Sequence, residues 1–153
     1  IFLWTMLLIS VYAGSKLKNM ISDWHPLVIH FPIALISSSV AFDFLYYIRK
    51  DDGLILASWW TMFFGLISSI FAIITGIIDD SLIGHLGAVW PLWDNHGAMQ
   101  IFSTICFSVL FYLRTYRPNV IKEGKLAFLL ISGVCVLILF YGAHLGAALS
   151  GRI

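Results

Sequence analysis

The chain has 153 residues, of which 60% are hydrophobic and 11% are charged, and its formal net charge is +1. A soluble domain of this length cannot bury so much apolar surface, so the composition excludes a soluble fold and predicts an integral membrane protein. The nearly neutral charge argues against a nucleic-acid partner. Neither of the two cysteines, Cys106 and Cys135, belongs to a covalent haem-attachment motif, and both are expected to be apolar packing residues.

The first 23 residues are predicted to form a separate N-terminal transmembrane or anchor segment with its linker. Ile1 to Gly14 is apolar, but as a helix it would extend only about 21 Å, less than the roughly 30 Å hydrocarbon core of a bilayer. We interpret it as the end of a longer spanning helix whose start precedes Ile1. An uncleaved signal anchor and an interfacial helix are the alternatives. Residues 24–153 are predicted to form the membrane domain.

Four full-length spans are predicted within that domain. Each contains more than 20 predominantly apolar residues and is bounded by charged or turn residues. They are Pro26–Ile48, Leu54–Ile78, His96–Tyr116 and Leu126–Leu149. The predicted fold class is therefore all-α, a polytopic membrane helical bundle with four core transmembrane helices in two hairpins and an additional N-terminal helix.

The basic residues predict the orientation of the chain in a bacterial inner membrane. One side carries most of them, namely Arg49, Lys50, Arg114, Arg117, Lys122 and Lys125. The positive-inside rule places this side in the cytoplasm. All five histidines then fall on the periplasmic side, and they are His25, His30, His85, His96 and His144. A one-sided layer of histidines at the edge of a membrane predicts a ligand site there.

The leading interpretation of this layer is an axial-ligand site for b-type haem. Neutral imidazole is a common ligand of haem iron, and helix bundles build cofactor sites from facing helices. His30, His96 and His144 are the favoured ligands. His25 is a further candidate, but it lies about 140° around a helix from His30 and cannot share one iron with it from the same face. Pro32 is expected to kink the helix beside His30.

Other chemistry remains open for the same residues. His30, His96 and His144 also suit a metal ion such as zinc or copper. A quinone site is another alternative, with His85 and Asp79 as a proton relay. The structural alternative is that the histidines at helix starts, His25 and His96, only cap their helices and meet lipid headgroups. Asp43 is expected to anchor an ion pair with Arg49 or Arg114.

Several motifs resemble one bacterial membrane family. The stretch HPLVIHFPIAL at His25–Leu35, with Asp43 after it, resembles the opening motif of the family called domain of unknown function 2231. Its later motifs are matched by Thr75–Asp79, by His96 with Arg114 and by Tyr141–Gly146. The resemblance covers about residues 24 to 150. It implies a four-helix membrane domain without an established activity, and fusions of some relatives to c-type cytochrome domains imply electron transfer.

These observations predict a membrane electron-transfer subunit that binds haem b near the periplasmic face. It would pass electrons between quinol and a periplasmic cytochrome within a larger respiratory or photosynthetic-type complex, and would not be an enzyme by itself. The main alternative is a cofactor-free structural or assembly subunit, whose partners are the lipid bilayer and other membrane subunits. A histidine-based metal site is the remaining alternative.

Overall fold

The computed structural model describes residues 12, 27–83, 91–119, 123 and 126–149. This part of the chain contains four helices long and apolar enough to cross a membrane, and no strand. They are α3 (His30–Arg49), α4 (Asp52–Ile83), α5 (His96–Tyr116) and α7 (Leu126–Leu149), and a short 3-10 helix, η1 (Leu92–Asp94), precedes α5. The predicted all-α bundle of four spanning helices is confirmed. The predicted N-terminal segment, apart from Tyr12, and its boundary at residue 24 lie outside the described residues.

Two helix boundaries differ from the prediction by four residues or more, the start of α3 and the end of α4. α4 ends at Ile83 rather than Ile78, because hydropathy marks where a chain leaves the bilayer and not where its helical hydrogen bonding stops. Val28 is helical, Ile29 forms a turn with φ −63° and ψ −23°, which are right-handed helical angles, and α3 begins at His30. Pro32 has no N–H to donate to the carbonyl of Val28 and lies in the first turn of α3. The kink predicted beside His30 stays a prediction, because the backbone at Ile29 keeps helical dihedral angles.

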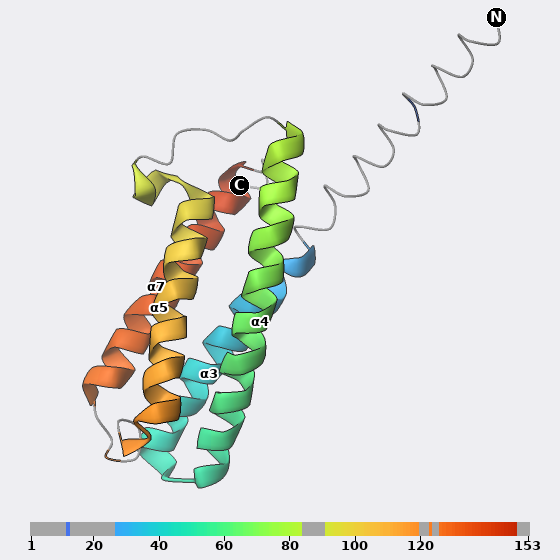
Figure 1. Cartoon of the computed structure of the whole chain (residues 1–153). Coiled ribbons are helices and arrows are strands. Elements are labelled where there is room, and N and C mark those ends of the chain that lie inside the picture. The colour runs from blue at the N-terminus through green and yellow to red at the C-terminus, as the bar shows by residue number, and fades with distance from the viewer. Residues whose placement is uncertain (1–11, 13–26, 84–90, 120–122, 124–125, 150–153) are drawn as a thin grey trace, which may run out of the picture.

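The helices pair as two hairpins. The most extensive contacts join α3 to α4 and α5 to α7, while α4 touches α5 and α3 touches α7 over smaller areas. We call the end where α3 and α5 begin and α7 ends the histidine end, and the opposite end, with the α3–α4 turn, the turn end. Figure 1 shows α4 and α5 close together near the turn end and farther apart toward the histidine end.

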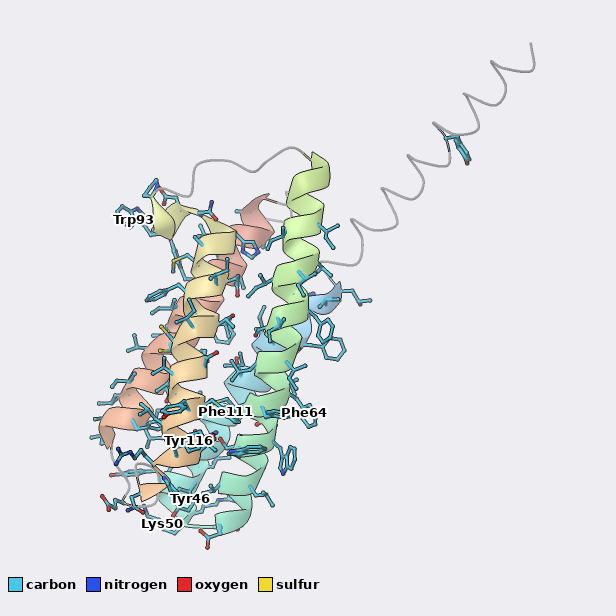
Figure 2. All side chains as sticks on the ribbon, viewed as in Figure 1. Tyr46, Lys50, Phe64, Trp93, Phe111 and Tyr116 are labelled. Carbon is cyan, nitrogen blue, oxygen red and sulfur yellow. The ribbon has the colours of Figure 1, made fainter. Side chains whose placement is uncertain are left out.

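The α3–α4 turn is closed by a single residue with left-handed backbone. Lys50 has φ 57°, and its N–H donates to the carbonyl of Tyr46 at 2.8 Å. The carboxylate of Asp51 then accepts the N–H of Gly53 at 2.9 Å. Figure 2 shows Lys50 and Tyr46 at this end of the bundle and Trp93 at the other. The turn therefore needs only two residues between α3 and α4, which forces the two helices to lie antiparallel.

Each hairpin is held by glycines that let two helix backbones approach closely. A Cβ at Gly65 of α4 would lie 2.7 Å from Cγ1 of Ile36 on α3. In the second hairpin, a Cβ at Gly142 of α7 would lie 3.1 Å from Cβ of Met99 on α5. Small residues have this role in membrane bundles, where burial of apolar surface does not itself favour helix association over lipid contact. The glycines thus fix which faces of the paired helices meet.

The interior of the bundle combines apolar and small polar side chains. The buried apolar cluster comprises Ile36, Val40, Tyr46, Met62, Phe107, Leu110, Phe128, Cys135 and Leu139. Buried serines lie among them on all four helices, and they are Ser39, Ser58, Ser69, Ser103 and Ser132. Most of the large apolar side chains outside this interior are exposed on the helix surfaces, as expected for a bundle surrounded by lipid.

Candidate functional site

The most polar site in the described interior is an ion pair between the two hairpins. Asp43 lies on the inward face of α3, one turn after Ser39, and its exposed fraction is 0%. Arg114 lies on the inward face of α5, one turn after Leu110, and is 4% exposed. The Nη2 atom of Arg114 donates to Oδ2 of Asp43. Because both residues follow the buried stripe of their helix, packing of the apolar neighbours brings the two charges together.

Hydrogen bonds from both helices of the first hairpin support the pair. Arg114 Nη1 donates to the hydroxyl of Ser39 at 3.2 Å and approaches the sulfur of Met62 at 3.8 Å. Ser39 and Ser58 also donate to each other's backbone carbonyls, each at 2.7 Å. This reciprocal bond joins α3 to α4 at the depth of the ion pair. Arg114 therefore contacts both helices of the first hairpin from the second.

The ion pair is incompletely satisfied. Oδ1 of Asp43 and Nε of Arg114 are buried without a hydrogen-bond partner among the described residues. Buried charges are costly in a membrane unless they are paired, and orphaned polar atoms in a native interior call for an explanation. The sequence prediction that Asp43 anchors an ion pair is confirmed, and the partner is Arg114, since Arg49 is exposed at the end of α3.

At the histidine end, His96 is part of the contact between α5 and α7. Its Nδ1 lies 2.6 Å from the carbonyl oxygen of Gly142. Since a carbonyl only accepts, Nδ1 carries the proton in this bond, and Nε2 carries the lone pair when the ring is neutral. A Cβ at Gly146 would lie 2.6 Å from Cε1 of the ring, so the imidazole occupies the space that a larger residue would fill.

His96 does not cap its helix. The N-cap of α5 is Asn95, whose Oδ1 accepts the N–H of Ala98 at 2.9 Å. The alternative in which His96 caps α5 is therefore wrong, because the side chain of Asn95, one residue earlier, caps the helix by accepting the Ala98 N–H. The sequence analysis missed Asn95, although an Asn directly before an apolar helical run is an ordinary N-cap signal.

The other favoured histidines lie at the same end but not in the interior. The side chains of His30 and His144 are exposed. His144 is two residues from both Gly142 and Gly146, which places it about 200° around α7 from the face that meets His96. His144 thus lies on the face of α7 opposite the one that His96 of α5 contacts. Within the described residues, no group of three or more His, Cys, Asp or Glu side chains is arranged to bind a metal ion.

Three of the predicted site residues cannot be placed in this arrangement. His25 and His85 lie outside the described residues. Asp79 belongs to α4, but its side chain is outside the described part of the structure. The predicted proton relay of His85 and Asp79 stays a prediction, as do the haem and quinone ligands.

Comparison with known proteins identifies the family. Neither the curated proteins nor the solved structures contain a match to this chain. A family model described as predicted membrane protein (DUF2231) matches residues 22–153, which include all four described spanning helices. The chain therefore belongs to the DUF2231 family of predicted membrane proteins.

Proposed function

We propose that this protein is a small integral subunit of a bacterial inner-membrane complex, and that its histidine end contacts a partner subunit. The observation that carries this proposal is the exposure of His30 and His144 near the ends of otherwise apolar helices. Ionisable side chains within membrane helices usually face a protein interior or a polar cavity rather than lipid. A partner subunit that covers these two histidines would give them such an environment.

The packing of the bundle supports a structural role for the rest of the molecule. Each hairpin is closed by glycine contacts, and the Asp43–Arg114 pair joins the hairpins. These contacts involve only residues of the chain itself. The outer faces of α4 and α7 expose large side chains such as Phe71 and Leu137, which suit contact with lipid or with an apolar helix of another subunit. At the histidine end, by contrast, the exposed side chains include those of His30 and His144, which are polar.

Site-specific photo-crosslinking in native membranes tests this proposal. A crosslinking residue at position 30 or 144 is expected to capture one defined protein, whereas the same residue at Leu137, which is 66% exposed, is expected to capture mainly lipid. His144→Ala should also shift the protein to a smaller species in native electrophoresis, while Leu137→Ala should not. Lipid capture at all three positions, with unchanged assembly size, would show that the histidines only meet headgroups.

A second candidate function is electron transfer through b-type haem, as the sequence analysis predicts. The bond from His96 Nδ1 to the Gly142 carbonyl favours it, because metal-ligating histidines usually donate their other ring N–H to a carbonyl or carboxylate. His96 would then supply one axial ligand, and haem would supply one-electron chemistry between quinol and a periplasmic cytochrome. Since His144 lies on the opposite face of α7, the second ligand would come from His30, His25 or a partner subunit.

A pyridine haemochrome assay on the purified protein and on its native complex tests the haem candidate. Haem that co-purifies with the wild type and is lost in His96→Ala would support it. A matched variant at the opposite end, Thr115→Ser, should retain the haem signal. Well-folded protein and complex without a haemochrome spectrum would eliminate this candidate and leave the subunit proposal standing.

A further inference from the structure

The two cysteines of the chain lie on neighbouring helices, where their side chains meet. Cys106 belongs to α5 and Cys135 to α7, the two helices of the second hairpin. Cys135 is 6% exposed and belongs to the buried apolar cluster, and Cys106 packs against that cluster. The thiol of Cys106 lies close enough to that of Cys135 to hydrogen-bond with it. The two thiols thus form a pair at the contact between the helices.

The pair follows the register in which α5 and α7 pack. Near the histidine end, a Cβ at Gly142 of α7 would lie 3.1 Å from Cβ of Met99 on α5. Cys106 is seven residues after Met99, and Cys135 is seven residues before Gly142. Seven residues are nearly two full turns, so each cysteine lies on the face of its helix that makes the glycine contact. Because the helices are antiparallel, both steps lead to the same level of the bundle.

The two helix backbones approach closely along this seam. A disulfide needs such an approach, because it joins residues whose Cα atoms are about 4.4–6.8 Å apart. Gly142 and Gly146 provide it on α7, where side chains of α5 fill the space beside them. Between these glycines and the cysteines, Nε2 of Gln100 on α5 donates to the carbonyl of Leu139 on α7 at 3.4 Å. The close approach therefore continues toward the level of the thiols.

The pair lies near the middle of the membrane. Cys106 is the central residue of α5, which has 21 residues, so it is about 15 Å from either end at 1.5 Å per residue. The hydrocarbon core of a bilayer is about 30 Å thick. Charged, water-soluble oxidants are excluded from this depth, because a charge is costly there. An uncharged, lipid-soluble oxidant can reach the pair from the side of Cys106, which is only partly buried.

The surroundings of the pair favour a disulfide over a metal site. Two thiolates on one soft ion such as Cu(I) would leave a net negative charge in the apolar interior, and an unpaired charge there is costly. Within the part of the chain that the structure describes, no further His, Cys, Asp or Glu side chain completes a metal site with the two thiols. A disulfide is uncharged and needs no other ligand.

We propose that Cys106 and Cys135 are a dithiol that a membrane quinone oxidises to a disulfide between α5 and α7. The two S–H bonds break and one S–S bond forms, while two electrons and two protons pass to the quinone, which becomes the hydroquinone. A quinone suits this site because it is uncharged, dissolves in the hydrocarbon core and accepts electrons and protons in pairs. The second hairpin is then covalently closed or open according to the redox state of the quinone pool.

Incubation of the pre-reduced full chain in lipid vesicles with a short-chain ubiquinone tests the proposal. Mass spectrometry after alkylation counts the free thiols, which are expected to fall from two to none in the wild type. One hydroquinone should form for each chain. Oxidised glutathione, which is charged and water-soluble, should leave both thiols free. Cys106→Ser should form neither an intramolecular disulfide nor hydroquinone.

The matched control moves one thiol to another face of α7 at the same depth. Cys135→Ala combined with Val134→Cys turns the thiol by about 100°, to a position that is 56% exposed in the wild type. This variant should keep both thiols free. Two free thiols in the wild type after incubation with quinone would overturn the proposal. So would an equal yield of disulfide in the control variant or with oxidised glutathione, or a disulfide between two chains. These outcomes do not depend on a partner at the histidine end, so they are independent of the proposed subunit role.

Discussion

Arg114 of α5 donates to Asp43 of α3, and this buried ion pair is the polar contact that joins the interiors of the two hairpins. The reciprocal hydrogen bonds between Ser39 and Ser58 lie within the first hairpin, and that of His96 lies within the second. The molecule is therefore two closely packed hairpins linked near their turn end. This arrangement leads to predictions that separate the role of each contact.

Removal of one member of the ion pair should strongly destabilise the bundle. Asp43→Asn or Arg114→Met leaves the other charge buried, which typically costs about 3–5 kcal/mol of unfolding free energy. The double variant Asp43→Leu with Arg114→Met removes both charges and should recover most of that loss. Unfolding of the purified protein by detergent titration measures the effect. Equal stability of the single variants and the wild type would contradict the structural role of the pair.

The serines beside the ion pair should differ in importance according to their partners. Ser39→Ala removes the hydrogen bonds to Arg114 and to the carbonyl of Ser58, and should cost about 0.5–2 kcal/mol. Ser68 donates only to the Gly65 carbonyl of its own helix, so Ser68→Ala is the matched control and should cost less. The same titration compares them. A larger loss from Ser68→Ala would mean that the contact between α3 and α4 does not depend on this bond.

Glycine substitutions should show where helix backbones touch. A Cβ at Gly65 would lie 2.7 Å from Ile36 Cγ1 and 3.2 Å from its backbone nitrogen, so Gly65→Ala should cost about 1–3 kcal/mol through overpacking. At Gly133 the nearest atom would be 3.8 Å away on the ring of Phe44, an ordinary contact distance. Gly133→Ala should therefore be tolerated. Thermal unfolding of the two variants distinguishes these sites, and similar losses at both would argue against the α3–α4 contact.

Substitution of the histidines should affect stability differently, because His96 packs between α5 and α7 whereas His30 and His144 are exposed. His96→Ala removes the bond to the Gly142 carbonyl and leaves a space beside Gly146, so it should cost about 1–3 kcal/mol in the isolated protein. His30→Ala and His144→Ala change exposed side chains and should leave that stability within about 0.5 kcal/mol. Detergent titration of the isolated protein measures all three. A large loss from His144→Ala would contradict its surface position.

Much of the architecture could be predicted from the sequence, since hydropathy and charge act locally along the chain. Apolar runs separated by charged turns predict four spans, and the alternation of spans predicts that His30, His96 and His144 lie at one end, as they do. Helix ends were less predictable. α4 continues beyond the apolar span that ends at Ile78, because helical hydrogen bonds form between backbone groups and do not require apolar side chains.

The geometry of the site depends on how each helix is rotated about its own axis. The sequence pattern does not specify this rotation. Sequence alone determined that this is a four-span membrane protein with histidines at one end and an ion-pair residue, Asp43, within a span. The tertiary structure decided that Asp43 meets Arg114, that His96 packs on α7 and that His144 faces away. Gly65 and Gly142 fix the faces on which α4 meets α3 and α7 meets α5, because a glycine without a side chain lets the neighbouring helix approach closely.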